Sequence, residues 1–261
     1  MEGGEKLGRY SLVGCDPLWI LSATGEDSQE NGTDGYRTIQ TFRDGQQVVF
    51  EGNPFTALAK CLSALQPVHL PQLPPGIGGL CGFWGYELIR WIEPRVKVHP
   101  QDNNIPDGLW MQVDHLLIFD QVKRKIWAVA YADLRGSNVD LKAAYEQACN
   151  MVSRMVNKLS EPLSPEKTIM EWTSPGSRTI GNEHNQEVGE YKSNFAKEEF
   201  CASVEKAKEY IKAGDIFQVV VSQRLSTEYS GDPFALYRSL RRLNPSPFLF
   251  HLDFGDFALV G

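Results

Sequence analysis

Residues 195–225 read FAKEEFCASVEKAKEYIKAGDIFQVVVSQRL, and residues 232–261 read DPFALYRSLRRLNPSPFLFHLDFGDFALVG. Apolar residues early in the first segment recur at three- and four-residue steps, the period that places side chains on one face of a helix. Gly214 follows the last of them, and glycine is typical of the position just past a helix end. We therefore expect a helix that ends at Gly214. Its apolar face would consist of Phe200, Val204, Ala207 and Ile211.

The rest of this region predicts a strand, a second helix and two further strands. Ile216 to Leu225 is a short run rich in β-branched and apolar residues, which indicates a mostly buried strand. Asp232-Pro233 has the residue types of a helix N-cap and first turn. The prolines of residues 244–247 must end that helix, because proline lacks an amide hydrogen and disfavours helical angles in the residue before it. The two strands would occupy residues 248–253 and 257–260.

Upstream of this region, predicted hairpins alternate with predicted helices. Asp44-Gly45 between two apolar runs is a strong hairpin signal, and Asn53-Pro54 indicates a helix start. The stretch Ser22 to Gly35 is rich in Gly, Asp, Ser and Asn, so we expect a surface loop there. The inner side of the helix after Asn53 would carry Phe55, Leu58, Leu62 and Leu65. The other expected elements are strands at 9–14, 36–42 and 47–50, a hairpin of 110–120 with 125–131, and a helix at 141–159 with Leu141, Tyr145, Ala148, Val152, Met155 and Leu159 inside.

A glycine-rich stretch, GGLCGFWGY at residues 78–86, has two interpretations. Glycines let backbone amides approach an anion, so a phosphate-binding loop is one. The spacing lacks the G-x-x-x-x-G-K pattern of such loops, however. The other is a strand in which the missing side chains let another backbone or a bulky ring pack closely. We favour the strand.

Composition limits the class of protein. The 261 residues are 42% hydrophobic, which suffices for a substantial core, and no apolar run approaches the roughly 20 residues of a membrane span. We therefore expect a soluble, cytoplasmic protein without a membrane partner. The formal net charge of -7 argues against nucleic acid, which is normally met by a basic surface. The cysteines contain no C-x-x-C pair and the histidines show no ligand spacing, so we expect neither a disulfide framework nor a zinc site.

Several long motifs resemble the anthranilate synthase component I (large-subunit) family of chorismate-utilising enzymes. They occur in the expected order and cover nearly the whole chain, which makes the resemblance much more specific than any short pattern. The motifs are GRYSLVG (8–14), GGLCGFWGYELIRWIE (78–93), IPDGLWMQVDHLLIFDQVKRK (105–125), IKAGDIFQVVVSQRL (211–225) and LNPSPFLFHLDFGDFALVG (243–261).

The resemblance implies a lyase of tryptophan biosynthesis. Chorismate and ammonia would give anthranilate and pyruvate, with the ammonia supplied from glutamine by a separate amidotransferase subunit, component II. Magnesium would bind the substrate carboxylates, and tryptophan would act as feedback inhibitor. In the family, the metal-binding glutamates and the basic substrate-binding residues lie beyond the point that matches Gly261. The resemblance therefore also implies a fragment, inactive alone, that lacks the family's extreme N-terminus and its C-terminal catalytic half.

The resemblance assigns two sites within this chain. Gln218 lies on the segment where water-adding relatives place a lysine as general base, and a glutamine cannot take that proton, which suits an enzyme that uses ammonia. A glutamine that satisfies a buried backbone group is the alternative. The tryptophan site would include the N-P-S-P-aromatic-aliphatic segment, whose prolines leave its carbonyls free to face a ligand. Its residues are Asn244, Pro245, Ser246, Pro247, Phe248 and Leu249, and a rigid helix-to-strand turn is the simpler interpretation.

The prominence of antiparallel hairpins predicts an α+β fold, and the resemblance implies packed antiparallel β-sheets with flanking helices. We expect three regions: 1–159, a Ser-, Pro-, Glu- and Gly-rich linker at 160–193, and the start of a chorismate-binding domain at 194–261. Two other functions stay open. One is component I of aminodeoxychorismate synthase in the folate pathway, and the other is a non-catalytic module that binds tryptophan or the partner subunit.

Overall fold

The computed structural model describes residues 8–25, 36–68, 70–74, 78–93, 95–96, 105–135, 138–163 and 191–261. The described chain divides into two compact units. The first unit runs to Leu163 and includes Ser246–Phe248, and the second contains the remaining residues from Tyr191 onward. The predicted linker at 160–193 lies mostly outside the described residues and stays a prediction. The described residues include no helix that is long and apolar enough to span a membrane.

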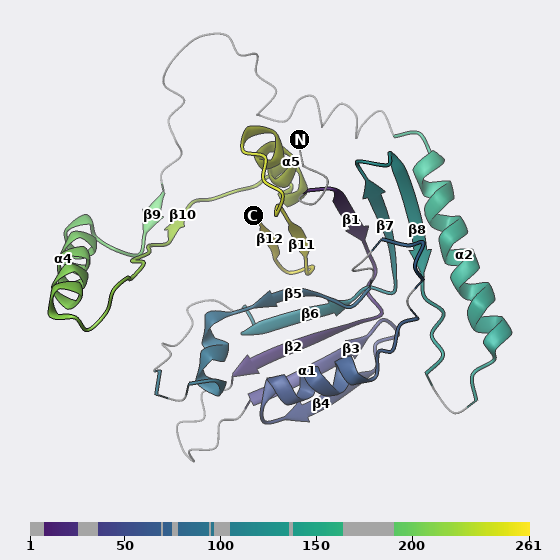
Figure 1. Ribbon diagram of the computed structural model, residues 1–261, viewed down its shortest axis with the longest axis horizontal. Coiled ribbons are helices and arrows are strands. Elements are labelled where there is room, and N and C mark those ends of the chain that lie inside the picture. Colours follow the sequence, from purple (N-terminus) through teal and green to yellow (C-terminus); the bar gives the residue numbers. More distant parts are fainter. Residues whose placement is uncertain are drawn as a thin grey trace, which may run out of the picture. The chain divides into compact units, whose positions relative to one another are not determined.

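A sheet of five antiparallel strands forms the core of the first unit. The strands in order across the sheet are β4 (Gln47–Glu51), β3 (Tyr36–Phe42), β2 (Trp19–Gly25), β6 (Gly108–Gln112) and β5 (Leu80–Trp84), as Figure 1 shows. Alternate residues of the central strand, Trp19, Leu21 and Ala23, are almost completely buried. Leu58 of helix α1 (Pro54–Ser63) packs into the same cluster. Helix α1 therefore packs on the sheet through the apolar face of β2.

The predicted hairpin at Asp44-Gly45 is confirmed. Gly45 has a φ of 88°, and the Asp44 carboxylate accepts a hydrogen bond from the Gln46 amide. The predicted loop at Ser22–Gly35 is wrong for its first residues, because β2 continues to Gly25. Ala23 is fully buried there, and the strand pairs with β3 on one side and with β6 on the other. This pairing keeps the polar residues at the end of β2 in the strand. Residues 26–35 lie outside the described residues.

Helix α1 begins at Pro54 as predicted, and the Asn53 side chain caps it. The predicted inner face is partly wrong, because Leu62 is exposed while Ala57 and Cys61 are buried. The apolar face of the helix is therefore rotated from the predicted one toward Ala57 and Cys61.

The glycine-rich stretch forms strand β5, as the favoured interpretation predicted. A Cβ atom on Gly82 would collide with the main-chain oxygen of Leu109 on β6. On Gly85 it would lie 2.5 Å from the main-chain oxygen of Asp107. The glycines therefore allow two backbones to come close together, and Leu80–Trp84 pairs with β6 as a strand instead of forming an anion-binding loop.

A second sheet of the first unit has three strands in the order β1 (Tyr10–Gly14), β7 (His115–Asp120) and β8 (Lys125–Ala130). Its core consists of Leu116, Ile118 and Val129. Helix α2 (Leu141–Ser160) packs against β7 and β8 (Figure 1). The helix itself was predicted, but its predicted inner face is only partly correct. Ala144 is its buried residue, while Leu141, Tyr145 and Leu159 are exposed.

The predicted strand 110–120 is wrong as a single element. The chain leaves the larger sheet after Gln112 and enters the smaller one at His115, with only Val113 and Asp114 between. The chain also crosses between the sheets between β1 and β2, after Gly14. An unbroken apolar run does not show such a crossing, because both halves have strand-forming side chains.

The described part of the second unit contains helix α4 (Lys197–Ala213), helix α5 (Pro233–Leu243) and two small antiparallel strand pairs. One pair is β9 (Lys192–Ser193) with β10 (Leu225–Ser226), on either side of α4 in sequence, and the other is the hairpin of β11 (His251–Asp253) with β12 (Ala258–Val260). Helix α4 ends before Gly214, whose φ is 82°, as predicted. The two final strands are shorter than predicted, and a turn at Gly255-Asp256 joins them.

The predicted buried strand at Ile216–Leu225 is wrong in this structure. Residues 216–224 form no ladder, and only Leu225 enters a short strand. Phe217 is 93% exposed and Val220 is 80% exposed. A strand needs a neighbour for its backbone groups and a cover for its apolar side chains. Residues 216–223 have no neighbouring strand within the described chain, while Arg224 bonds to Asn194 through its main-chain groups.

An ion pair joins Arg9, just before β1, to Asp120 at the end of β7 in the smaller sheet. The Arg9 guanidinium donates to both carboxylate oxygens of Asp120, at 3.0 Å and 2.8 Å. One of these oxygens also accepts the amides of Val122 and Lys123, which caps the turn between β7 and β8. The hydrogen bond from Arg9 is the largest influence on Asp120 and, with the amides, lowers its pKa from 3.8 to about 2 against the opposing effect of burial.

We predict that Gly82→Ala destabilises the first unit by about 3 kcal/mol or more, because the new methyl group would collide with the β6 backbone rather than with a movable side chain. Urea unfolding measures the change. Gly52→Ala is the control, since nothing lies within 4 Å of its Cβ position and only its φ of 82° causes strain, about 1–2 kcal/mol. Equal losses for both variants would contradict the close backbone contact.

We predict that the Arg9–Asp120 pair makes stability pH-dependent. Because folding lowers the pKa of Asp120, its contribution is complete above about pH 4 and is lost as the pH falls toward about 2. Asp120→Asn should therefore lower the melting temperature at pH 7 and flatten its decline between pH 4 and pH 2. The exposed Asp256 offers the control variant Asp256→Asn, which should leave the wild-type slope unchanged. An unchanged slope in Asp120→Asn would refute this linkage.

Candidate functional site

The segment Asn244–Leu249 connects α5 to the last hairpin. Its first residue is the C-cap of α5, and the Asn244 amide donates to the main-chain oxygen of Leu240 at 2.9 Å. Farther along, the Ser246 hydroxyl accepts the Phe248 amide at 3.3 Å. Residues 245–249 belong to no helix or strand. The helix thus ends where the prolines predicted, and the backbone beyond it is irregular.

Both ends of this segment are fixed by the second unit. At the far end, Phe250 and Gly261 exchange two main-chain hydrogen bonds, of 2.8 Å and 3.1 Å. The His251 ring lies 5.4 Å from the Phe234 ring and 5.9 Å from the Tyr237 ring, centre to centre. The hairpin is therefore held against α5 by aromatic contacts. The sequence analysis assigned His251 no role. No local sequence pattern indicates that a histidine on this strand packs on helix α5.

The side chains of the segment differ in exposure. Phe248 is 73% exposed, and Asn244, Pro245 and Pro247 are exposed as well. Ser246 and Leu249 are half-buried. An exposed aromatic ring next to backbone carbonyls outside any ladder can offer stacking and hydrogen-bond acceptance to a small ligand.

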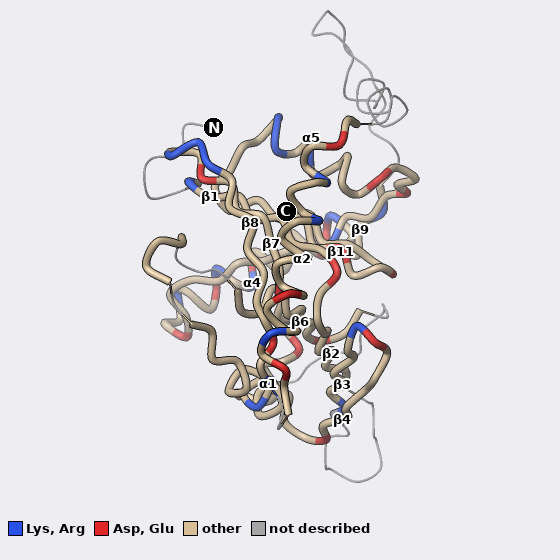
Figure 2. Tube along the Cα trace, turned by 90° about the vertical axis from the view of Figure 1, so that its right-hand side faces the viewer, with Lys and Arg blue, Asp and Glu red and all other residues tan. Residues whose placement is uncertain are grey.

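Helix α5 brings basic charge to the start of the segment. Arg238, Arg241 and Arg242 occupy its second half, and Figure 2 shows basic positions along this helix. Basic residues near a helix C-terminus interact favourably with its partial negative charge. In a chain with a net charge of -7, this helix is a local concentration of positive charge.

Gln218 lies in the extended segment that follows α4, and its side chain is exposed. It forms no hydrogen bond with the residues that the structure describes. Burial against a backbone group, the alternative role considered for this glutamine, therefore does not occur within the described chain. No hydrogen bond joins Gln218 to Asn244–Leu249 within these residues.

The described residues do not contain a ligand set for magnesium. No three His, Cys, Asp or Glu side chains in this part of the chain are grouped so as to hold a metal ion. The described side chains therefore do not fit the cofactor that the resemblance implies, and none of them is assigned to it.

Comparison with known families gives one match that covers most of the chain. The model of the chorismate binding enzyme family matches residues 18–261. The chain belongs to the chorismate-binding enzyme family. The fold is α+β, as predicted, with two antiparallel sheets and covering helices in the first unit and helices and small strand pairs in the second, and it is the family's fold as this sequence forms it.

Relatives of this family member are named anthranilate synthase component 1. The protein of that name from Synechocystis sp. is 56% identical over 262 residues, and the one from Cereibacter sphaeroides is 40% identical. Both alignments cover 100% of this chain and 48% of the relative. The chain thus spans about half the length of the curated relatives it matches.

A solved structure has the same fold. It is described as the crystal structure of anthranilate synthase component I from Streptococcus pneumoniae TIGR4, and it superposes with a TM-score of 0.68 at 27% sequence identity. The superposition covers 97% of this chain and 49% of that chain. The likeness thus extends over nearly all of the chain.

We predict that His251→Ala loosens the segment at its far end. Loss of the two ring contacts should destabilise the packing of the hairpin on α5 by about 1–2 kcal/mol. Hydrogen exchange should then become faster at the amides of Phe250 and Gly261. Phe217→Ala is the control, because its ring is 93% exposed and the variant should leave both amides unchanged. Unchanged exchange in His251→Ala would show that other contacts hold the hairpin.

Proposed function

We propose that this chain functions in an anthranilate synthase component I, which converts chorismate and ammonia to anthranilate and pyruvate in tryptophan biosynthesis. The observation that carries the proposal is the 56% identity, over the whole of this chain, with the Synechocystis protein of that name. The motifs quoted above support the same assignment. A glutamine amidotransferase subunit, component II, would supply the ammonia, and magnesium would bind the substrate carboxylates.

The proposed role of Gln218 is that of a side chain that cannot act as a base, so that water is not activated as a nucleophile. A lysine at this position can act as a base and remove a proton from water, whereas a glutamine amide only donates and accepts hydrogen bonds. Ammonia needs no such base, since its unprotonated form is already a nucleophile. The exposure of Gln218 on an extended segment supports this role, because the side chain is accessible to a ligand.

The proposed role of Asn244–Leu249 is to bind tryptophan as feedback inhibitor. Tryptophan has an ammonium group and an indole NH, and both need acceptors. The two prolines cannot donate main-chain hydrogen bonds, and residues 245–249 lie outside every ladder, so their carbonyls are suited to accept. The exposed Phe248 ring could stack on the indole.

The position of the amino group on the product ring tests the main proposal. The complete gene product that contains these residues is incubated with chorismate, ammonium and magnesium, and the product is identified by chromatography and fluorescence. The ortho product, anthranilate, would support it. A para-substituted product would instead assign the protein to aminodeoxychorismate synthase of the folate pathway.

We also propose that the 261-residue chain has no turnover by itself, because the resemblance places the metal-binding glutamates outside it. The same assay on the purified chain tests this, and anthranilate formation would refute it. Calorimetry with tryptophan and with the amidotransferase subunit separates the remaining alternative, a binding module without catalysis. Heat with either partner, without turnover in the complete product, would favour that module.

We predict that Pro245→Ala weakens tryptophan inhibition of the complete enzyme about tenfold, since a freer backbone must be ordered on binding, at a cost of about 1.4 kcal/mol. The measurement is the tryptophan concentration that halves the initial rate. Pro233→Ala is the matched control, because it makes the same change at the first turn of α5, away from the segment. Equal inhibition of both variants and wild type would remove Asn244–Leu249 from the effector site.

A further inference from the structure

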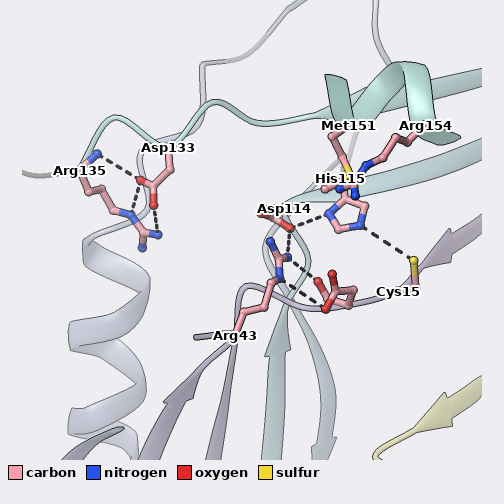
Figure 3. Close-up of polar contacts among 9 residues, drawn as sticks. Cys15, Arg43, Asp114, His115, Asp133, Arg135, Met151 and Arg154 are labelled. Carbon is pink, nitrogen blue, oxygen red and sulfur yellow. Dashed lines mark hydrogen bonds and ion pairs between the residues drawn. The ribbon is translucent and has the colours of Figure 1, made fainter. Parts of the chain in front are cut away.

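A cysteine, a histidine and an aspartate lie in line where the chain crosses between the two sheets of the first unit (Figure 3). His115 is only 3% exposed. Its Nδ1 is 2.8 Å from Asp114 Oδ1, and its Nε2 is 3.9 Å from the Sγ of Cys15. The thiol lies at an exposed residue, while the imidazole behind it is buried.

The contacts determine which ring nitrogen faces the thiol as an acceptor. A carboxylate only accepts hydrogen bonds, so the proton between Asp114 and His115 belongs to Nδ1. In the neutral ring, the lone pair is then on Nε2 and points at Cys15. This order of groups, in which a carboxylate orients an imidazole that can accept the proton of a nucleophile, is the arrangement that activates thiols and hydroxyls.

Charged neighbours keep the carboxylate in place. The Arg43 guanidinium donates to Asp114 Oδ1 at 2.8 Å, also donates to the main-chain oxygen of Asp16, and lies 3.5 Å from the Asp16 carboxylate. Asp114 also raises the pKa of Arg135 through its charge, although Asp133 is the main cause of that shift. From α2, which packs on β7, Arg154 donates to the Sδ atom of Met151 at 3.3 Å. Asp114 is thus held between β7 and the β3–β4 turn.

The other four cysteines have different surroundings. Cys61 is buried and Cys81 is an exposed residue, but partial desolvation raises the pKa of both thiols, which disfavours their reactive thiolate form. Cys149 is hydrogen-bonded to the phenol of Tyr145, and this bond raises the pKa of Tyr145. Cys201 is exposed on α4. Within the described residues, an imidazole contact is recorded for Cys15 and for no other cysteine.

We propose that Cys15 is a site of oxidative modification by peroxides, with His115 as the base that accepts its proton and Asp114 as the residue that positions His115. In the first step the sulfur attacks one oxygen of hydrogen peroxide. A sulfur–oxygen bond forms, the oxygen–oxygen bond breaks, and the proton held by His115 leaves with the departing hydroxide as water. The thiol is oxidised to a sulfenic acid and the peroxide is reduced.

The position of Cys15 gives this modification a structural consequence. The residue directly follows β1, and Asp16 after it has a φ of 51°, which is unusual for a residue with a side chain. The Cys15–Asp16 turn is where the chain leaves the smaller sheet. A change at the sulfur therefore acts on the connection between the two sheets.

The test is a competition between cysteines in one folded chain. The protein is treated with a small amount of hydrogen peroxide, sulfenic acids are trapped with dimedone, and each cysteine peptide is quantified by mass spectrometry over time. Cys15 should be labelled about tenfold faster or more than the exposed Cys149 and Cys201. Equal rates at the three sites would overturn the proposal.

Two further measurements show whether the faster labelling of Cys15 comes from its contact with His115 or from the residues next to it in sequence. In urea the advantage of Cys15 should fall to about one, because unfolding removes His115 from the sulfur. An advantage that survives unfolding would overturn the role of His115. In His115→Gln, a folded variant should lose the advantage of Cys15 and keep the wild-type rates at Cys149 and Cys201. Retention of the advantage in that variant would count equally against the proposal.

Discussion

The first unit depends on two places where the chain passes from one sheet to the other. After Gly14 the chain leaves the smaller sheet, and after Gln112 it leaves the larger one. A main-chain hydrogen bond from the Leu18 amide to Gln112 joins the two passages, and one from the Arg43 amide to Leu18 joins the first passage to the end of β3. Because strands of both sheets begin or end here, the registers of β1 on β7 and of β2 on β6 are set together. A shift in one sheet would have to be matched in the other.

Local sequence signals predicted the parts of the fold that depend on local chemistry. Asp44-Gly45 marked a hairpin, Asn53-Pro54 a helix start and Gly214 a helix end, since each residue type is favoured by the backbone geometry found there. The crossing at Val113–Asp114 could not be read in this way. The side chains before and after it are equally apolar, and only the partners that they meet in space differ. The same limit explains Ile216–Leu225, where a strand-forming composition finds no neighbouring strand in the described chain before Leu225.

The candidate sites show a similar division. The prolines at 245 and 247 correctly predicted the end of α5, because their effect on the backbone is local. The packing of His251 on Phe234 could not be predicted, since the two residues come from different elements. The same holds for Cys15 and His115, which are 100 residues apart in sequence and share no motif. Family resemblance could assign Gln218 and Asn244–Leu249 to roles, but it carried no information about contacts peculiar to this chain.

The distribution of tryptophan gives the two units different optical properties. Trp19 and Trp110 are buried in the larger sheet of the first unit, and residues 191–261 contain no tryptophan. Indole emission shifts to longer wavelength when a buried ring meets water, so the intrinsic fluorescence of these buried rings follows the opening of the first unit. The described part of the second unit is nearly silent at that wavelength, although it contributes two helices to the far-ultraviolet circular dichroism. Trp172 is the one tryptophan beyond residue 163, so fluorescence and circular dichroism recorded on one sample of a Trp172→Phe variant would separate the unfolding of the two units.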